Sequence, residues 1–358
     1  MPNKLNIAFV YSKRYSFYPP DYFGRGLGGT ECMLVLLARA LARLGHNVEV
    51  YNCCFKDGIY DGVKWKSLWT IDQNKKFDVV ISLRLLETFK NYTFNSTIRA
   101  VWIHDEELQG ATELDKNGLV NMWISVSSTQ KEFIERKEVI QPKNWFVTRN
   151  AFDEEIYTNT LRKIKKIKNQ VIYCSSPDRG LRYLLDIWPE IKERIPDAKL
   201  IVTGSYALWG TSDEENNRIF REIYNKASNL KDVKVFQRLS KRELAKLQAE
   251  SEIMLYPTAF NEMFCISALE CFVVGTPIIS SKRAAMIERV QDEENGFLID
   301  SLYGSSDYKK EFIDKSCYFF ENQNVKDDFS KNASSISDQM NFEKLAKEWE
   351  SEFLKRLK

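Results

Sequence analysis

The stretch IMLYPTAFNEMFCISALECFVVGTPIISS, residues 253–281, contains one complete strand–helix–strand unit. Short apolar runs at its two ends, 253–257 and 277–281, predict buried strands. The residues between them predict a helix that begins near Phe264. A strand, a helix and a second strand in this order are typical of a parallel sheet that is covered by helices.

Glu262 and Glu270 lie eight positions apart in this unit, one in the loop after the strand and one inside the helix. Two helical turns rise about 11 Å, which is close to the distance from a hexose to the ribose of a sugar nucleotide. One carboxylate could therefore face sugar hydroxyls while the other binds a ribose diol. The alternative is two ordinary surface charges, since helices are rich in Glu. Glu270 favours a site, because it falls inside an apolar run where an unpaired charge is costly.

The same alternation of strands and helices runs along most of the 358-residue chain, and this length suggests about two domains. We expect two doubly wound α/β domains, residues 1–158 and 171–335, joined by a polar and basic linker over 159–170. The final segment, 336–358, has apolar residues at helical spacing and should pack back on the N-terminal domain. The predicted strands are 5–11, 47–53, 77–83, 98–104, 122–128 and 144–150 in the first domain, and 171–176, 198–204, 233–237, 253–257, 277–281 and 296–299 in the second.

Composition argues against several classes of protein. The chain has 52 basic and 50 acidic residues, so charge gives no case for a nucleic-acid partner. Its seven cysteines are dispersed without metal-site spacing, which fits free thiols in a reducing compartment. No run approaches the roughly 20 apolar residues of a membrane span, and the apolar N-terminal stretch is too short for a signal peptide. We therefore expect a cytoplasmic protein that is at most peripheral to a membrane.

A glycine-rich loop, GRGLGGTE (24–31), precedes the first predicted helix. It formally matches the G-x-G-x-x-G fingerprint of dehydrogenases, but it lies a dozen residues after the strand. The next strand also ends in Asn52, where that fingerprint requires an acidic residue. Gly28 and Gly29 stand directly before the helix, so backbone amides there could approach a diphosphate or a sugar. The alternative is a flexible surface loop with a threonine that caps the helix.

Several motifs follow one another in a recognisable order. They are GGTE before a helix, WIHD at 102–105, RNAFD at 149–153, SSPDRGLRYLLDIWPEI, PDAKLIVTG and the run that holds Glu262 and Glu270. Together they resemble the retaining glycosyltransferases of family 4 over about residues 1–300. The resemblance implies the GT-B fold, with two Rossmann-like domains that face each other across a cleft. The nucleotide-sugar donor would lie mostly on the C-terminal domain and the acceptor mostly on the N-terminal domain.

The resemblance also implies roles for individual residues. Glu262 would bind hydroxyls of the transferred sugar, and Glu270 would bind the ribose. The backbone amides at Met263 and Phe264 would lie beside the sugar and the diphosphate. His104 would meet the donor sugar near the reacting centre. A lone histidine in a strand is more often a core residue, but this one ends its strand, where α/β sites form.

Arg179, before Gly180, stands where the family often has a lysine that binds the diphosphate, and a guanidinium suits that contact. The alternative is a solvated arginine in a first helical turn. Ser176, just upstream, is a further donor-side candidate. The family's second basic residue has no counterpart in 173–175, and the substitutes that the sequence offers are Arg182, Arg238, Lys282 and Arg283. Relatives often have Gly-Gly-x-x-E after the strand 277–281, whereas this chain has Ala284, Ala285 and Glu288, so the identity of the sugar stays open.

The resemblance implies transfer of a hexose from a GDP- or UDP-sugar to a hydroxyl of a carbohydrate, lipid or other acceptor. Configuration would be retained, and the leaving diphosphate would take the acceptor proton. No cofactor is expected, and no D-x-D-like run has a context that supports a metal site. Two alternatives stay open: a non-catalytic protein that binds a nucleotide sugar, and the same fold with another reaction, such as epimerisation. Five aromatic residues before the glycine loop either form an acceptor platform or pack within the loop: Tyr15, Phe17, Tyr18, Tyr22 and Phe23.

Overall fold

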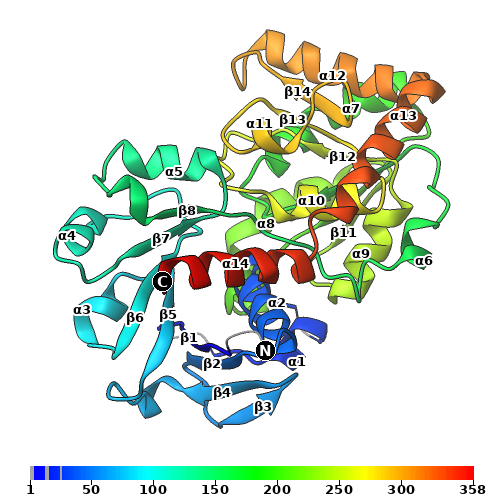
Figure 1. Cartoon of the computed structure of the whole chain (residues 1–358). Helices are drawn as coiled ribbons and strands as arrows, with labels where there is room; N and C mark the ends of the chain where they lie inside the picture. Colours follow the sequence, from blue (N-terminus) through cyan, green and yellow to red (C-terminus); the bar gives the residue numbers. More distant parts are fainter. Residues whose placement is uncertain (1–3, 13–15, 25) are drawn as a thin grey trace. The chain divides into compact units, whose positions relative to one another are not determined.

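The computed structural model describes residues 4–12, 16–24 and 26–358, and it divides into two α/β units (Figure 1). The first unit contains Met1–Tyr22, Gly28–Ala151 and Asn341–Lys358, and the second contains Phe23–Leu27 and Phe152–Met340. The segment 159–170, which was expected to be a linker, lies within the second unit and includes the short helix α6 (Asn159–Arg162).

The first unit is built on one sheet with the strand order β3-β4-β2-β1-β5-β6-β7-β8. All neighbouring strands are parallel except β3, which pairs antiparallel with β4. In the centre of the sheet, Ile7 of β1 lies opposite Val48 of β2 and Val79 of β5, so apolar side chains line up across strands. The strands are β1 (Asn6–Val10), β2 (Asn47–Asn52), β3 (Gly58–Tyr60), β4 (Val63–Ser67), β5 (Phe77–Leu83), β6 (Ser96–Trp102), β7 (Met122–Ser125) and β8 (Trp145–Val147).

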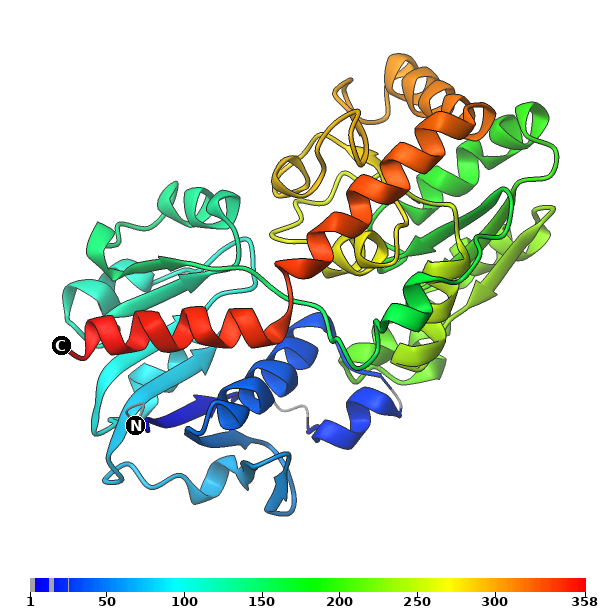
Figure 2. The same ribbon diagram turned by 45° about the vertical axis from the view of Figure 1, so that its right-hand side comes forward.

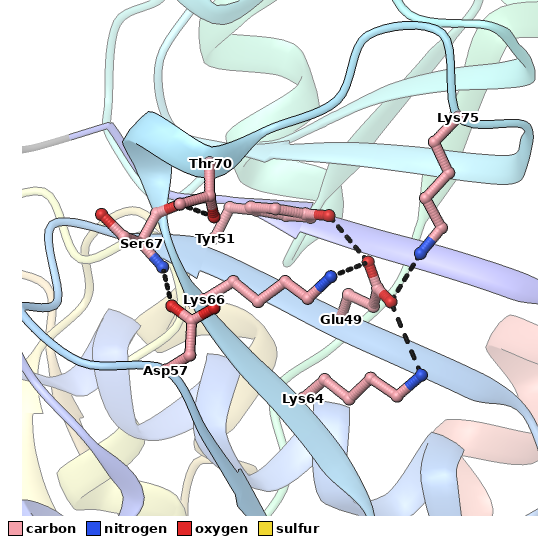
Figure 3. A network of polar contacts seen from close by, with 8 residues as sticks. All are labelled: Glu49, Tyr51, Asp57, Lys64, Lys66, Ser67, Thr70 and Lys75. Carbon is pink, nitrogen blue, oxygen red and sulfur yellow. Dashed lines mark hydrogen bonds and ion pairs between the residues drawn. The ribbon is translucent and has the colours of Figure 1, made fainter.

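Strands β3 and β4 were not predicted, because polar residues interrupt their short apolar runs. Along β4, Val63 and Trp65 are buried, while Lys64 and Lys66 alternate with them and point to the other face. There they surround the carboxylate of Glu49 on β2, to which Lys75 donates at 2.6 Å (Figure 3). Burial alone would raise the pKa of Glu49, but the hydrogen bonds from Lys75 and Tyr51 and the lysine charges lower it. The lysines therefore neutralise a buried carboxylate near the edge of the sheet.

Two layers of helices cover the first sheet. Helix α2 (Gly29–Arg43) packs against β2 and β4, and α14 (Phe342–Arg356) lies along α2 (Figures 1 and 2). The indole of Trp349 on α14 contacts Trp102 of β6, with ring centroids 4.9 Å apart. The last helix therefore packs on the N-terminal unit, as predicted. Apolar residues on the opposite face pack with α3 (Glu87–Asn91), α4 (Ala111–Lys116) and α5 (Ser128–Glu135).

The aromatic residues before the glycine loop mostly pack within the protein. Phe17 and Tyr22 are buried, and the ring of Phe17 contacts Trp65 with centroids 5.7 Å apart. The hydroxyl of Tyr18 accepts the backbone N–H of Phe55 at 3.0 Å. Tyr15 lies outside the described residues. Loop packing therefore accounts for Phe17 and Tyr22, whereas α1 (Pro19–Phe23) leaves Phe23 exposed.

The second unit has a fully parallel sheet with the order β11-β10-β9-β12-β13-β14. Its strands are β9 (Gln170–Cys174), β10 (Lys199–Thr203), β11 (Val233–Phe236), β12 (Ile253–Tyr256), β13 (Ile278–Ser281) and β14 (Gly296–Ile299), which confirms the predicted set. Helix α7 (Leu181–Arg194) packs against α8 (Asp213–Asn229) and α12 (Ser306–Glu321), while α10 (Ile266–Val273) packs against α9 (Lys241–Glu250) and α13 (Gln323–Ser334). The predicted α/β class with two Rossmann-like units is thus confirmed.

Each sheet has one topological switch point. In the first unit, β1 and β5 are neighbours, and the strands that follow β1 in the sequence are added on one side of this pair while those that follow β5 are added on the other side. In the second unit, β9 and β12 hold the corresponding places. Loops that leave two such neighbouring strands toward opposite faces open a crevice at their carboxyl ends, and ligands of α/β proteins bind there. The fold therefore points to two places, one in each unit, where a site is expected.

Candidate functional site

The second unit brings Arg179 and Glu262 together at its switch point. Arg179 follows β9 and Glu262 follows β12, and the two lie 83 positions apart in the sequence. Nη1 of Arg179 donates to Oε1 of Glu262 at 3.0 Å, and the hydroxyl of Tyr256 donates to the same oxygen at 2.6 Å. The hydroxyl of Ser175 donates to that of Tyr256 at 3.2 Å. Two residues that were predicted separately thus form one ion pair. The hydroxyl of a buried tyrosine donates a hydrogen bond to the same carboxylate.

The Arg179 guanidinium is held by charge and by an aromatic ring. It lies over the ring of Phe260, 3.9 Å from the centroid, and about a quarter of the side chain stays exposed. Burial alone would lower the pKa of Arg179, but the charge of Glu262 outweighs it and the pKa rises. Burial, and then the charge of Glu262, raise the pKa of Tyr256 well above its usual value. Arg179 is therefore a fixed cation and Tyr256 a neutral hydrogen-bond donor.

Gly180 allows the two loops to lie close together. Its φ is +107°, and a Cβ at this position would lie 1.8 Å from the carbonyl oxygen of Pro257. Only glycine accepts both conditions, so it fixes the start of α7 against the loop after β12. That loop is fixed in turn by Thr258, whose N–H donates to Oγ of Ser281 at 3.1 Å. The arginine and the glutamate are therefore positioned by backbone contacts as well as by their own ion pair.

The loop that holds Glu262 also contacts the segment where the family pattern departs. The N–H of Ala285 donates to the carbonyl of Glu262 at 2.9 Å. Ala284 has a φ of +46°, in the left-handed region that favours glycine, so alanine occupies a conformation for which relatives often have glycine. Arg283 donates from Nε to Oδ1 of Asn261 at 2.6 Å. Of the four substitutes considered for the second cation, Arg283 is thus tied to the residue next to Glu262.

The other three substitutes form ion pairs with carboxylates elsewhere. Arg182 pairs with Glu222, and Lys282 pairs with Asp300 at 2.7 Å. Arg238 lies 3.7 Å from Asp213. Ser176 is buried, and its hydroxyl donates to Asp178, two residues along the same loop.

Glu270 is buried and forms an ion pair with Lys241 at the start of α9. The sequence analysis missed Lys241, because helix α9 comes from a distant part of the chain. A signal existed, since Ser240 and Glu243 form a capping box that marks Lys241 as the first residue of a helix. Lys241 thus compensates the charge of Glu270 inside its apolar run, so Glu270 is not an unpaired buried charge.

Met263 and Phe264 are buried in the short connection from Glu262 to α10. The helix begins at Ile266, two residues later than predicted, and Cys265 before it has a φ of +64°. The side chain of the N-cap residue, Cys265, makes no capping hydrogen bond, and the first backbone amides of a helix have no acceptor within the helix itself. The Arg289 guanidinium lies 4.4 Å from the centroid of the Phe264 ring and covers it.

His104 lies at the end of β6 in the first unit. Burial, and then the charge of Arg84, lower the pKa of His104 to about 3, so the imidazole is neutral near pH 7. Its ring contacts Trp102, with centroids 4.7 Å apart. Within residues 4–12, 16–24 and 26–358, its buried Nε2 has no hydrogen-bond partner. A neutral histidine with an unpaired nitrogen can offer a substrate one hydrogen bond.

Gly28 and Gly29 form the start of α2 in the first unit. Gly28 is the N-cap residue with an extended conformation, and as a glycine it has no side chain that could cap the helix. The alternative of a capping threonine is therefore wrong, because Thr30 already lies inside the first turn. The open amides of this turn could contact a ligand.

Two searches of the described residues bear on other chemistry. No group of three or more His, Cys, Asp or Glu side chains in this part of the chain is arranged to hold a metal ion. No helix within the described ranges is long and apolar enough to cross a membrane.

Residues 161–335 match the family model described as "Glycosyl transferases group 1". This range includes Arg179, Glu262 and Glu270 with the loops that carry them. Trehalose synthase from Thermococcus litoralis is 24% identical over 160 residues, 44% of this chain and 36% of that protein. A putative glycosyltransferase of Bacillus subtilis, YtcC, is 26% identical over 159 residues, 44% of this chain and 37% of that protein. The matches thus span little more than a third of these relatives.

Solved structures match over nearly the whole chain. Sucrose-phosphate synthase from Thermosynechococcus elongatus has a TM-score of 0.74 at 14% identity and covers 98% of both chains. HepE from Anabaena, in complex with UDP and glucose, has a TM-score of 0.71 at 15% identity, covering 98% of this chain and 99% of that one. At such low identity the likeness shows the fold, which is the GT-B class. Together with the match over 161–335, it supports a glycosyltransferase.

Proposed function

We propose that this protein is a retaining glycosyltransferase that moves a hexose from a UDP- or GDP-sugar to a hydroxyl of a carbohydrate or lipid-linked acceptor. The observation that carries the proposal is the contact of Arg179 and Tyr256 with one oxygen of Glu262 at the switch point of the second sheet. The match over 161–335 supports the reaction class, and the complex of HepE with UDP and glucose supports UDP as the first nucleotide to test.

Glu262 has one oxygen left for a substrate. Oε1 accepts the hydrogen bonds of Arg179 and Tyr256, and no described residue donates to Oε2. Oε2 would accept a hydroxyl of the transferred sugar. The Arg179 cation would bind the diphosphate, since a guanidinium matches phosphate geometry. Glu270, held by Lys241, would bind the ribose diol with its second oxygen.

The chemical step would retain the configuration at the anomeric carbon. The bond from that carbon to the diphosphate oxygen breaks as the acceptor oxygen attacks from the same face. The proton of the acceptor hydroxyl passes to the departing diphosphate oxygen. Arg179 and the backbone amides at Met263 and Phe264 would stabilise the negative charge that develops on the diphosphate. His104, which is neutral, would contribute a hydrogen bond to the sugar rather than a charge. The step requires no cofactor, and we place it in the cytoplasm.

Donor binding and donor turnover, measured together, test the proposal. Thermal unfolding is recorded with UDP, GDP and ADP and with their glucose, galactose and mannose conjugates, because a ligand that binds the native state raises the melting temperature. At a ligand concentration of about 100 times Kd, the native state gains about 2.7 kcal/mol. We expect one nucleotide series to stabilise the protein and its sugar conjugate to be consumed. Stabilisation without turnover would favour a non-catalytic protein that binds a nucleotide sugar, and an inverted product would overturn retention.

A further inference from the structure

Large apolar side chains are exposed on the β3–β4 hairpin, at the edge of the first sheet, and on the loops beside it (Figure 1). Phe55 is 94% exposed, Trp69 is 78% exposed and Ile59 is 71% exposed. Single exposed apolar residues are ordinary, but several large ones close together in one segment mark a surface that binds a partner. We call Phe55, Ile59 and Trp69 the hairpin patch.

A hydrogen bond at one end of the hairpin brings the segments of Phe55 and Trp69 together. Oδ1 of Asp57 accepts the N–H of Ser67 at 2.9 Å, which joins the loop before β3 to the end of β4 (Figure 3). Phe55 lies two residues before Asp57, and Trp69 lies two residues after Ser67. The hydroxyl of Tyr18 accepts the N–H of Phe55 and the N–H of the next residue, each at 3.0 Å. The exposed ring of Phe55 is thus presented by a fixed backbone.

Trp69 and Ile59 are also presented by ordered elements. Trp69 belongs to the short turn η1 (Leu68–Thr70), which is anchored because Leu68 is buried in the core of the first unit. Ile59 lies opposite Lys64 in the register of the hairpin. Opposite residues of an antiparallel pair share one face of a sheet. An apolar and a basic side chain are therefore neighbours on the exposed face of the hairpin.

Lysines outnumber acidic residues around the hairpin patch. Residues 53–76 contain five lysines and three aspartates. The ammonium groups of Lys64, Lys66 and Lys75 lie 3.9, 3.5 and 2.6 Å from the carboxylate of Glu49 (Figure 3). One carboxylate neutralises only one of these three charges. The group therefore keeps an excess of positive charge beside the exposed apolar side chains.

This combination fits the surface of a membrane that contains anionic lipid. Aromatic side chains favour the boundary between water and lipid, and lysines are attracted to anionic headgroups. Lys56, directly after Phe55, is exposed and forms no ion pair with any residue in the described ranges. A second copy of the chain fits less well, because a symmetric dimer would bring the same lysines against one another.

We propose that the hairpin patch binds the protein to the surface of a membrane that contains anionic lipid. Phe55, Ile59 and Trp69 enter the headgroup region, while the lysines around them contact lipid phosphates. The contact is reversible, since only a few side chains enter the lipid. It involves the first unit and no nucleotide sugar, so it is independent of the proposed reaction.

Co-sedimentation of the full chain with vesicles tests the proposal. The vesicles consist of phosphatidylcholine alone, or of equimolar phosphatidylcholine and phosphatidylglycerol. We expect binding to the second kind, and added salt should weaken it. Phe55→Ala and Trp69→Ala should each lower the partition constant about ten-fold, because a large apolar side chain no longer leaves water. Lys56→Gln should lower it about five-fold, since one positive charge near the headgroups is lost.

Two variants of the second unit are the matched controls. Leu302→Ala removes an apolar side chain that is 81% exposed, and Lys331→Gln removes an exposed lysine. Both should bind vesicles as the parent protein does. Thermal unfolding should show that every variant stays folded, because the replaced side chains are exposed. Brominated phosphatidylcholine in the anionic vesicles should quench the tryptophan fluorescence of the parent protein more than that of Trp69→Phe, which reports directly on contact with lipid.

The inference fails if the chain does not bind anionic vesicles, or if it binds both kinds of vesicle equally. It also fails if Phe55→Ala and Trp69→Ala bind as the parent protein does, or if Leu302→Ala loses as much binding as they do. Self-association that Trp69→Ala abolishes, without vesicle binding, would assign the patch to a second copy instead. Vesicle binding without donor turnover would support the hairpin patch and refute the transferase, and turnover without vesicle binding would do the reverse.

Discussion

At the scale of single residues, Glu262 accepts hydrogen bonds from two different side chains on one carboxylate oxygen. Arg179 and Tyr256 both donate to its Oε1 and so restrict the rotamer of the side chain, while Oε2 is the oxygen that we propose binds the substrate. Tyr256 was not singled out from the sequence, since a tyrosine in an apolar strand reads as core. Tyr256 lies six positions before Glu262, and the loop between them folds back so that the tyrosine hydroxyl reaches the carboxylate.

Replacing Glu262 by glutamine should keep the size of the side chain and remove its charge. Tyr256 can still donate to the amide oxygen, but the ion pair with Arg179 is lost. We expect turnover of the donor sugar to fall about a hundred-fold, the usual size for a preorganised polar group at a reacting centre. Steady-state turnover with the best nucleotide sugar measures this. Glu294→Gln, an exposed glutamate of the same unit, should retain parental turnover. Equal turnover in both variants would remove Glu262 from the site.

Arg179→Lys tests whether the shape of the cation matters as well as its charge. Lysine lacks the planar fork that stacks on Phe260 and reaches Glu262. We expect the Kd for UDP to rise about ten-fold, which corresponds to about 1.4 kcal/mol. Titration calorimetry measures it. Arg182→Lys is the matched control, because Arg182 lies three positions along and its side chain is 64% exposed. A Kd unchanged by Arg179→Lys would mean that a positive charge at this position is enough and that the planar guanidinium adds nothing to the binding of UDP.

Neighbouring alanines should respond to glycine with opposite signs. Ala284 has a φ of +46°, which costs an L-residue about 1–2 kcal/mol. Ala284→Gly should therefore raise the free energy of unfolding, by up to about 1 kcal/mol after the greater entropy of glycine is counted. Ala285 has a φ of −69° and is buried, so Ala285→Gly should lower it by about 1 kcal/mol. Urea unfolding measures both, and a loss in both variants would contradict the strain argument.

At the scale of elements, the pattern of apolar residues predicted the buried strands of both sheets. Every strand predicted from an apolar run is present, because such runs match parallel strands that are buried on both faces. The hairpin β3–β4 was missed, since β3 has only three residues and the alternation of valine, lysine and tryptophan in β4 spans only five. The pairing of Lys241 with Glu270 was missed for another reason. This ion pair joins two helices, and a local sequence pattern does not predict which distant lysine or arginine will contact a given carboxylate.

Helix α14 is expected to stabilise the first unit through Trp349. The indole is fully buried, contacts Trp102, and donates from Nε1 to the hydroxyl of Thr148 at 3.0 Å. Trp349→Ala should lower the free energy of unfolding by about 3–5 kcal/mol, as large-to-small changes in cores do. Denaturant unfolding followed by circular dichroism measures this. Trp69→Ala is the control, because Trp69 is 78% exposed and its loss should change stability by less than about 0.5 kcal/mol.

At the scale of the whole molecule, stability should depend on pH through buried histidine. The pKa of His104 is about 3 in the folded chain, against an ordinary value of 6.5. The unfolded chain therefore takes up the proton first as pH falls. The stability from the neutral imidazole is complete above pH 6.5 and declines between pH 6.5 and about 3. From pH 6.5 to 5 this group should remove about 2 kcal/mol.

His104→Gln should lessen this acid dependence. Glutamine does not titrate, so the variant should lose less stability between pH 7 and pH 5 than the parent protein. Urea unfolding at both pH values gives the difference. His46, the second histidine, is also buried, and burial lowers its pKa, so some acid dependence should remain. Equal pH dependence in parent and variant would show that His104 titrates normally.

The division of the chain into Gly28–Ala151 and Asn341–Lys358 on one side and Phe152–Met340 on the other has a consequence for synthesis. A ribosome completes nearly all of the second unit before it produces α14, which the first unit needs for one face of its sheet. Domains commonly fold as the chain emerges. Here most of the first unit is synthesised first, but its last helix is synthesised after the second unit. Until α14 is made, Trp349 is not there to pack on Trp102. Chaperone binding during translation would therefore concentrate on the first unit.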